Sequence, residues 1–374
     1  MMDMRVRAAE VSADDLVIDV EPRFDFLSDE YRDLFTRSDL TAFQAPLWQA
    51  AIHRDLVPAQ GARQHTVAVR DAGDRGLLAV LPLVKQKLGP LTVIQPADFG
   101  VCDANAIVGD DHVLEAIANS PQARRRLAAA LNGVGALLFR KLRRDGFDLR
   151  RLFDGVTSSV GENAAYYSET GDDFEFWQRK TLNRKFSKEL GRLGRQIERE
   201  FGAYEHRLVH SEDEIRAAFD FLQRARQDRF KSDLLDNPVF VDFYRNYAIA
   251  GAAGGEALTY VSYLNGEPVA VLFGVGHQDQ CHAVLIGADT ERLAKYSVGM
   301  QLLYRVIKLR FDSGLHRLDF GLGNTGYKSL FRVEETLLDN FSIARSPAGA
   351  LFTTVYHRSK PLKNALRRFA PRLR

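Results

Sequence analysis

The sequence predicts an α/β protein of two tandem lobes, each a mixed, mainly antiparallel sheet flanked by helices. Three observations support this fold class. The chain has 374 residues, which is long for a single ordinary domain and suits two. The second half reads as two helices, three β-rich runs, a helix and a last strand. The first half repeats this order in weaker form, so a duplicated architecture is expected.

The strands of the second half are marked by composition and by a turn signal. Residues 257–264 and 268–276 are β-rich and are joined by Asn265-Gly266, a pair that supplies the positive φ angles of a tight hairpin turn. Residues 281–289 read as a third antiparallel strand. Helical spacing of apolar residues precedes this meander at 212–229 and 239–250.

A helix and a short strand follow the meander. Val298, Leu302, Val306 and Leu309 have helical spacing and predict a helix over 297–312, with Gly314 at its end. The last strand, residues 318–320, runs into a glycine-rich loop.

The first half offers equivalents of most of these elements. We expect helices at 40–56 and 113–131, and strands at 65–71, 76–87 and 136–141, with 76–87 as the partner of 65–71. We place the first lobe at residues 1–165, the second at 174–345 and a basic tail at 346–374. The boundary falls in the polar stretch 161–173.

Composition excludes several classes of protein. There are 51 basic and 49 acidic residues, a net charge of +2, so extensive nucleic-acid contact is not expected. Two cysteines, Cys102 and Cys281, make neither a disulfide framework nor a metal knuckle. The N-terminus has no apolar signal segment and no run is long enough to cross a membrane. We expect a cytoplasmic protein, with any membrane contact peripheral and at the inner face.

The segment AKYSVGMQLLY at residues 294–304 starts a helix with a glycine. Free amides at a helix N-terminus favour an anion such as a pyrophosphate group. We place cofactor binding at Lys295, Ser297, Gly299 and Met300, with Ser297 as the helix cap and Lys295 as a nearby cation. A capped helix start without a ligand is the alternative.

The segment LDFGLGNTGYKSLF at residues 318–331 carries the candidate catalytic side chains. Asp319 can act as a general base or orient an amine, Lys328 can stabilise an oxyanion, and Tyr327 can protonate a leaving thiolate. Gly321 and Gly323 are candidate substrate-binding positions. The alternative is that Asp319 caps the loop and Lys328 is a surface cation.

A basic helix is expected over residues 179–199. Its cations, among them the candidate substrate ligands Arg184 and Lys188, repeat at helical spacing opposite an apolar stripe. Such a stripe can hold phosphates, or can simply be a solvated face. The tail from Tyr356 has seven Arg or Lys residues and no acid, so it is either a disordered tail or an anchor on anionic lipid. His277 and His282 flank Cys281 without a fourth ligand, so no metal site is expected.

The second half resembles the CelD-type acetyltransferases of the GNAT superfamily, which are found beside bacterial cellulose and exopolysaccharide genes and are distant relatives of the Fem peptidyltransferases. The resemblance covers roughly residues 174–331 and rests on YVSYLNGEPVAVLFGVGH and on YSVGMQLLYRVIKLRFDSGLHRLDFGLGNTGYKSLF. It implies two GNAT lobes that transfer an acyl group to an amine or hydroxyl, commonly on a sugar. The recurrent positions of that family fall on Gly299, Asp319, Gly321, Gly323, Tyr327 and Lys328. Val298 departs from the proline that often precedes the glycine.

Three functions compete. The first is an acyl-CoA-dependent N-acyltransferase, most simply an acetyltransferase using acetyl-CoA, that acts on a sugar or lipid-linked saccharide in exopolysaccharide or envelope biosynthesis. The second is a Fem-like transferase with an aminoacyl-tRNA donor. The third is a GNAT scaffold that senses a phosphorylated ligand without catalysis, and the single glycine of the phosphate loop keeps it open.

Overall fold

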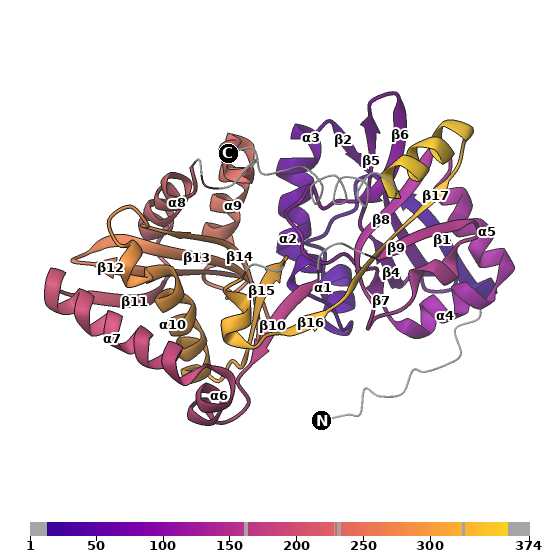
Figure 1. Cartoon of the computed structure of the whole chain (residues 1–374). Coiled ribbons are helices and arrows are strands. Elements are labelled where there is room, and N and C mark those ends of the chain that lie inside the picture. The colour runs from indigo at the N-terminus through magenta and orange to yellow at the C-terminus, as the bar shows by residue number, and fades with distance from the viewer. Residues whose placement is uncertain (1–12, 161–163, 228, 230–232, 324–325, 358–374) are drawn as a thin grey trace. The chain divides into compact units, whose positions relative to one another are not determined.

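The computed structural model describes residues 13–160, 164–227, 229, 233–323 and 326–357. The chain packs into two compact units, both of which mix strands and helices (Figure 1). Unit 1 comprises residues 1–40, 52–162 and 337–374, and unit 2 comprises residues 41–51 and 163–336. The predicted α/β fold class is confirmed.

Unit 1 contains a four-stranded sheet, in the order β1-β3-β4-β7, and a six-stranded sheet, in the order β2-β5-β6-β8-β17-β9. The strands of the first are β1 (Leu16–Glu21), β3 (Thr66–Asp71), β4 (Leu77–Leu81) and β7 (Val108–Gly109). Those of the second are β2 (Ala62–Gln64), β5 (Leu83–Leu88), β6 (Leu91–Pro96), β8 (Ala136–Arg143), β17 (Leu338–Ala344) and β9 (Val156–Val160).

Helices of unit 1 complete its apolar core. They are α1 (Asp29–Thr36), α3 (Val57–Ala59), α4 (Asp111–Asn119) and α5 (Pro121–Ala130). Val69 of β3, Ile117 of α4, Leu127 of α5 and Phe341 of β17 belong to one buried cluster. Burial of this apolar surface is the main favourable contribution to folding of the unit.

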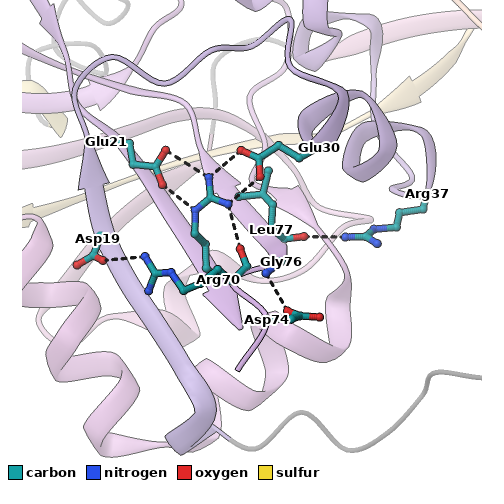
Figure 2. Close-up of polar contacts among 9 residues, drawn as sticks. Asp19, Glu21, Glu30, Arg37, Arg70, Asp74, Gly76 and Leu77 are labelled. Atoms are coloured by element: carbon teal, nitrogen blue, oxygen red, sulfur yellow. Dashed lines mark hydrogen bonds and ion pairs between the residues drawn. The ribbon is translucent and has the colours of Figure 1, made fainter. Parts of the chain in front are cut away.

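An arginine in β3 ties three elements of unit 1 together (Figure 2). The Nε of Arg70 donates to Glu21 of β1 at 2.8 Å, and its two Nη atoms donate to the carboxylate of Glu30 in α1 at 2.7 Å each. These hydrogen bonds raise the pKa of Arg70, with Glu30 contributing most. The planar guanidinium therefore links α1 to β1 and β3 of the four-stranded sheet.

Unit 2 is built on one seven-stranded sheet, in the order β11-β12-β13-β14-β15-β10-β16. The strands are β11 (Tyr204–Val209), β12 (Ala257–Leu264), β13 (Glu267–His277), β14 (Gln280–Ala288), β15 (Arg317–Leu322), β10 (Ala165–Glu169) and β16 (Glu334–Thr336). The helices are α2 (Pro46–Ala51), α6 (Phe174–Thr181), α7 (Arg184–Phe201), α8 (Glu212–Arg226), α9 (Pro238–Gly251) and α10 (Val298–Asp312).

Helices cover both faces of this sheet. Figure 1 shows α8 and α9 on one face and α7 and α10 on the other. Leu302 and Val306 of α10 share a buried cluster with Ile197 of α7 and Leu272 of β13. The sheet is thus sandwiched, which explains why every residue of β12 is buried.

Most elements predicted for the second half are confirmed within one or two residues. The strand predicted at 257–264 is β12, and the turn at Asn265 and Gly266 has φ angles of 52° and 85°. The helices predicted at 212–229, 239–250 and 297–312 are α8, α9 and α10. The basic helix is α7, and it starts at Arg184 rather than at residue 179 because Asn183 caps it.

Two predictions for the first half need correction. The helix expected at 113–131 is two helices, α4 and α5, because Pro121 cannot continue a helix and Ser120 caps the second one. The strand expected at 76–87 is broken at Pro82: β4 pairs with β3 as predicted, but β5 pairs with β6 in the other sheet.

The two units are not separated by the single sequence boundary that was expected. Residues 41–51, inside the first lobe by sequence, pack with unit 2. Residues 338–344, expected in the second lobe, form β17, which pairs with β8 and β9 in unit 1. Its alternating buried residues, such as Phe341 and Ile343, supply the core of that unit and explain the placement.

The basic tail lies mostly outside the described residues, which end at 357. Residues 347–357 are helical, with Phe352 against a small apolar cluster around Val93. The described part of the chain contains no helix long and apolar enough to span a bilayer.

Candidate active site

Strands β14 and β15 lie side by side for three residues and then part. They are parallel, and the paired residues are Gln280 with Arg317, Cys281 with Leu318, and His282 with Asp319. Beyond this point β14 continues along β13 to Ala288, while β15 pairs with β10. The last paired residues, His282 and Asp319, therefore stand where the sheet opens.

A β-bulge turns β14 away at this position. In the register with β13, Phe273 pairs with Leu285 and Gly274 with Ala283, which leaves Val284 as an extra residue. A Cβ on Gly274 would lie 2.6 Å from the Sγ of Cys281 and 3.0 Å from the His282 carbonyl. Only glycine admits so close an approach, and bulges of this kind often adjoin active sites.

His282 and Asp319 form a buried pair. Their exposed fractions are 4% and 6%, and the Nδ1 of His282 is 3.5 Å from the Oδ2 of Asp319. The ring of Phe43 lies over the imidazole, with the ring centres 5.0 Å apart. The Nε2 of His282 is buried and has no hydrogen-bond partner in the described chain.

The chemistry of this pair is that of a base and its orienting group. A carboxylate beside Nδ1 favours the tautomer that carries its proton there, which leaves Nε2 as the acceptor. The distance of 3.5 Å is long for a hydrogen bond, as is common in enzymes without substrate. The buried Nε2 is then a hydrogen-bond acceptor without a donor among the described residues. The N–H or O–H group of a substrate would supply that donor.

Lys328 holds the loop that follows β15. Its side chain is 2% exposed, and its Nζ donates to the carbonyls of Gly321 at 2.7 Å and Leu322 at 3.1 Å. The Nζ also lies 4.9 Å from the centre of the Tyr166 ring. The alternative interpretation of Lys328 as a surface cation is therefore wrong.

The same loop holds Asp319. The amide of Gly321 donates to the Oδ1 of Asp319 at 2.7 Å, and Gly321 has a φ of 74° that favours glycine. Gly323 also has a positive φ, and its amide lies 3.3 Å from the carbonyl of Ala164 in unit 2. Gly321 thus connects two candidate residues, since its amide binds Asp319 and its carbonyl binds Lys328.

Tyr327 precedes Lys328 and packs, half-buried, against the cluster that contains Phe331. No described contact places its hydroxyl at the His282–Asp319 pair. Its role as a general acid stays a prediction.

The glycine-started helix is α10. Ser297 has a φ of 52° and makes no side-chain cap bond, so its expected role as a capping side chain is wrong. A capping hydroxyl needs extended backbone at that residue, and Ser297 is left-handed instead. Its carbonyl still accepts from the amides of Met300 and Gln301, at 2.9 Å and 3.0 Å.

Gly299 fits this helix closely against the sheet. A Cβ at Gly299 would lie 3.3 Å from the Cβ of Ala288, at the end of β14. The glycine is thus explained by packing, and it also places no side chain beside the first turn of α10, the end of a helix that favours an anion. Lys295 nearby is directed to other partners: its Nζ is 3.4 Å from Glu200 and lies over the Tyr296 ring.

Two arginines of α8 and the following segment reach the open edge of β14. The amide of Asp289 donates to Val269 of β13, so by strand alternation the carbonyls of residues 286 and 288 face the opposite edge. Arg226 donates to the Ile286 carbonyl at 2.7 Å, and Arg229 donates to the Ala288 carbonyl at 3.3 Å. Because Ala288 lies close to Gly299, Arg229 is bound to the end of β14 that lies near the start of α10.

The predicted substrate ligands Arg184 and Lys188 are exposed on α7. They share one face of the helix with Arg192, Arg195 and Arg199. Arg192 pairs with Glu189 at 2.7 Å, whereas the other four cations form no ion pair with any residue that the structure describes. In the part of the chain that the structure describes, no contact connects this face to the His282–Asp319 pair.

Two other kinds of chemistry find no support in this unit. Burial raises the pKa of Cys281 to about 11, so its thiol stays protonated and is a poor nucleophile. No group of three His, Cys, Asp or Glu side chains that could hold a metal ion occurs among the described residues.

Sequence reasoning missed His282, Arg226 and Arg229 as site residues. His282 was considered only as a possible metal ligand beside Cys281. Its partnership with Asp319 depends on the parallel register of β14 and β15 across 37 positions of sequence, which no local pattern indicates. The alternation of β14 did place His282 on the opposite face from Cys281, and that was the available signal.

Comparison with known proteins agrees with this geometry. Residues 184–329 match the family of acetyltransferase (GNAT) domains. Among solved structures, FemX superposes with a TM-score of 0.59 at 11% identity, over 84% of this chain and 95% of that one. L-PGS from Bacillus licheniformis gives 0.55 at 11% identity, over 89% and 96%. A conserved protein of unknown function from Bacteroides thetaiotaomicron gives 0.53 at 12% identity, over 88% and 100%.

A search among curated proteins gives no match. At these identities the structural similarities speak for the fold alone, whereas the match over residues 184–329 speaks for the kind of domain. That stretch contains α7, the meander from β12 to β14, the opening between β14 and β15, and α10. Residues 184–329 therefore match a GNAT acetyltransferase domain, which supports an acyltransferase activity, and the chain as a whole shares its fold with FemX and L-PGS.

Proposed function

We propose that the protein transfers an acyl group from an acyl-CoA, most simply acetyl-CoA, to an amine, with His282 as the general base. The observation that carries this proposal is the buried His282–Asp319 pair, with the unpartnered Nε2 at the point where β14 and β15 part. The amine attacks the thioester carbonyl, a C–N bond forms, and the C–S bond breaks. Nε2 accepts the proton that the amine loses, and Asp319 stabilises the imidazolium that results.

The donor would lie along the open edge of β14. Its phosphates suit the start of α10 at the amide of Gly299, with Arg229 as the neighbouring cation. Lys328 and Gly321 hold the loop and so keep Asp319 in place. We therefore assign Lys328 a positioning role, rather than the direct contact with an oxyanion that the sequence suggested.

The acceptor that we propose is an amino sugar of an exported polysaccharide or of its lipid-linked precursor. The resemblance of residues 174–331 to CelD-type acetyltransferases supports it. Mass spectrometry of polysaccharide from cells with and without the protein would identify the group by its mass. An unchanged polysaccharide would contradict this acceptor while leaving acyl transfer itself intact.

Kinetics with purified protein test the base directly. Release of CoA from acetyl-CoA is followed with a thiol reagent, in the presence of amino-sugar acceptors. His282→Gln should lower kcat by about 10²- to 10⁴-fold, the usual contribution of a general base. Asp319→Asn should also lower it, because the imidazole then loses its orienting charge.

His277→Gln is the matched control, since His277 lies at the end of β13 and outside the pair. It should retain the rate of the unaltered protein. Full turnover in both His282→Gln and Asp319→Asn would refute the assignment. Circular dichroism establishes that each variant is folded.

A second candidate uses an aminoacyl-tRNA as donor. The observation that favours it is one face of α7. It carries four cations that have no carboxylate partner among the described residues, along about 22 Å of helix at 1.5 Å per residue: Arg184, Lys188, Arg195 and Arg199. Ribonuclease treatment distinguishes the two donors. Loss of product after digestion would favour the tRNA donor, whereas an unchanged yield of product would exclude it.

A further inference from the structure

A second cluster of charged side chains lies in unit 1, where strand β8 is bulged. At its centre is Asp98, which follows β6 and is 1% exposed. Its Oδ1 accepts from the Gly100 amide at 2.7 Å, and its Oδ2 accepts from the Nδ2 of Asn105 at 3.0 Å. Both carboxylate oxygens are therefore already hydrogen-bonded to neutral donors.

Two cations stand over this carboxylate without binding it closely. The Nη2 of Arg140 is 3.6 Å from one oxygen of Asp98, and the Nζ of Lys141 is 3.7 Å from the other. Burial acts to raise the pKa of Asp98, but the charges of Lys141 and Arg140 outweigh it and hold that pKa below its usual value. One buried negative charge thus faces two positive charges, which leaves the cluster with a surplus of one.

The convergence of these two cations requires an irregular strand. Arg140 and Lys141 are consecutive, and consecutive side chains of a regular strand point to opposite faces. In the register with β17, Leu142 pairs with Asp339 and Phe139 with Phe341. Arg140 and Lys141 therefore both oppose the single residue Asn340, and this bulge directs both side chains to the same carboxylate.

The backbone at the bulge is strained. Lys141 has a φ of 55°, a left-handed conformation that glycine adopts far more readily. Its amide is held by the Oδ1 of Asn340 at 2.9 Å. Strain retained at a non-glycine residue is typical of sites where the position of the side chain matters more than local stability. A glycine would satisfy the backbone here but would supply no charge.

Both cations keep N–H donors that have no hydrogen-bond partner among the described residues. The Nη2 of Arg140 donates to Gln95 at 3.2 Å, and the Nζ of Lys141 donates to the Cys102 carbonyl at 2.5 Å. Neither has a second carboxylate partner within the described residues. The two side chains are 30% and 23% exposed, so both are partly open to solvent, and the buried Nε of Arg140 has no hydrogen-bond partner among the described residues.

We infer that Arg140 and Lys141 form a binding site for a small oxyanion, a phosphate or a carboxylate group, with Asp98 as the residue that positions them. A guanidinium and an ammonium that share one carboxylate suit an added anion, because the ligand neutralises the surplus charge and fills the vacant donors. A purely structural neutralisation of Asp98 would need one cation and no strained lysine. This site is independent of the acyl transfer proposed above.

Titration calorimetry of the full chain tests this site, with inorganic phosphate and acetate as separate ligands at constant ionic strength and without an acyl donor. Lys141→Gly removes the cation and fits the left-handed backbone, so it should fold and should resist heat at least as well as the unaltered protein. Arg140→Gln keeps a donor for Gln95. Arg143→Gln is the matched control: Arg143 lies on β8 like the two site cations, but it is partly exposed and pairs with Asp145 instead of Asp98.

Saturable binding of phosphate or acetate is expected, with an affinity that falls about tenfold or more in Lys141→Gly and in Arg140→Gln and is unchanged in Arg143→Gln. Binding of phosphate alone or of acetate alone would identify the class of anion. Absence of saturable binding of either ion would overturn the inference. The inference would also be overturned if both site variants bound the ion as tightly as the unaltered protein, since the ion would then bind elsewhere, for example at the start of α10.

Discussion

His206 of β11 should make the stability of unit 2 depend on pH. The imidazole is largely buried, and its Nδ1 lies 2.8 Å from the Oγ of Ser262. Burial, assisted by the charge of Arg305, lowers the pKa of His206 to about 4. In the unfolded chain the pKa returns to its ordinary value of about 6.5. Between these two values the unfolded chain binds a proton that the folded unit does not.

The sign of the effect follows from this difference in bound protons. Above about pH 6.5 the His206 imidazole is neutral in both the folded and the unfolded state, so it does not change the free energy of unfolding. As the pH falls from about 6.5 to about 4, the free energy of unfolding decreases, and below about pH 4 the loss stops growing. With the two pKa values given, the loss between pH 7 and pH 4.5 is about 2.5 kcal/mol.

Urea denaturation at pH 7 and pH 4.5 measures this loss. Both tryptophans, Trp48 and Trp177, lie in unit 2, so their fluorescence reports its unfolding. The comparison is with His206→Gln, which can still hydrogen-bond Ser262 but does not titrate. Carboxylates contribute equally to both proteins and cancel. If the variant loses as much stability as the unaltered protein, the reasoning about His206 is wrong.

Three further outcomes follow from packing and hydrogen bonds. Gly274→Ala should destabilise unit 2 by about 1–3 kcal/mol, because the added methyl group clashes at the β14 bulge. Gly146→Ala, with open space around the added methyl group, should leave stability unchanged, and urea denaturation of both variants measures the difference. Arg70→Met should cost unit 1 about 2 kcal/mol, visible as faster hydrogen exchange of the β1 and β3 amides, and unchanged protection would contradict the network of Figure 2. Lys328→Met should lower kcat at least about tenfold with the KM for acyl-CoA unchanged, and a change in KM alone would argue for a donor contact instead.

Local sequence signals were sufficient for the elements of unit 2. Asn265-Gly266 specified its hairpin because few other residues adopt two successive positive φ angles, and the apolar spacing from Val298 specified α10. The same signals located the loop of Asp319 and Lys328. They did not predict which partner each polar side chain binds. Lys328 was expected at the surface or at an oxyanion, and it binds two backbone carbonyls instead.

Long-range pairing explains what sequence reasoning could not reach. His282 meets Asp319 only because β14 and β15 are neighbours in the sheet, and the helix α10 separates them in sequence. Likewise, Arg140 and Lys141 converge only because β17, about 200 residues away, imposes a bulge on β8. Neither register leaves a periodic trace in the chain, since the partner strand determines it.

The placement of β17 bears on the order in which the protein can fold during synthesis. This strand lies between β8 and β9 in the six-stranded sheet, yet it is translated after the whole of unit 2. When only residues 1–162 have left the ribosome, β17 is missing from the six-stranded sheet. Strand β9 then has none of the described strands to pair with. Unit 2, by contrast, ends at residue 336, so all of its residues have been translated before β17. We therefore expect nascent unit 1 to depend on protection from aggregation until residue 344 has emerged, and a fragment that stops at residue 162 to be insoluble.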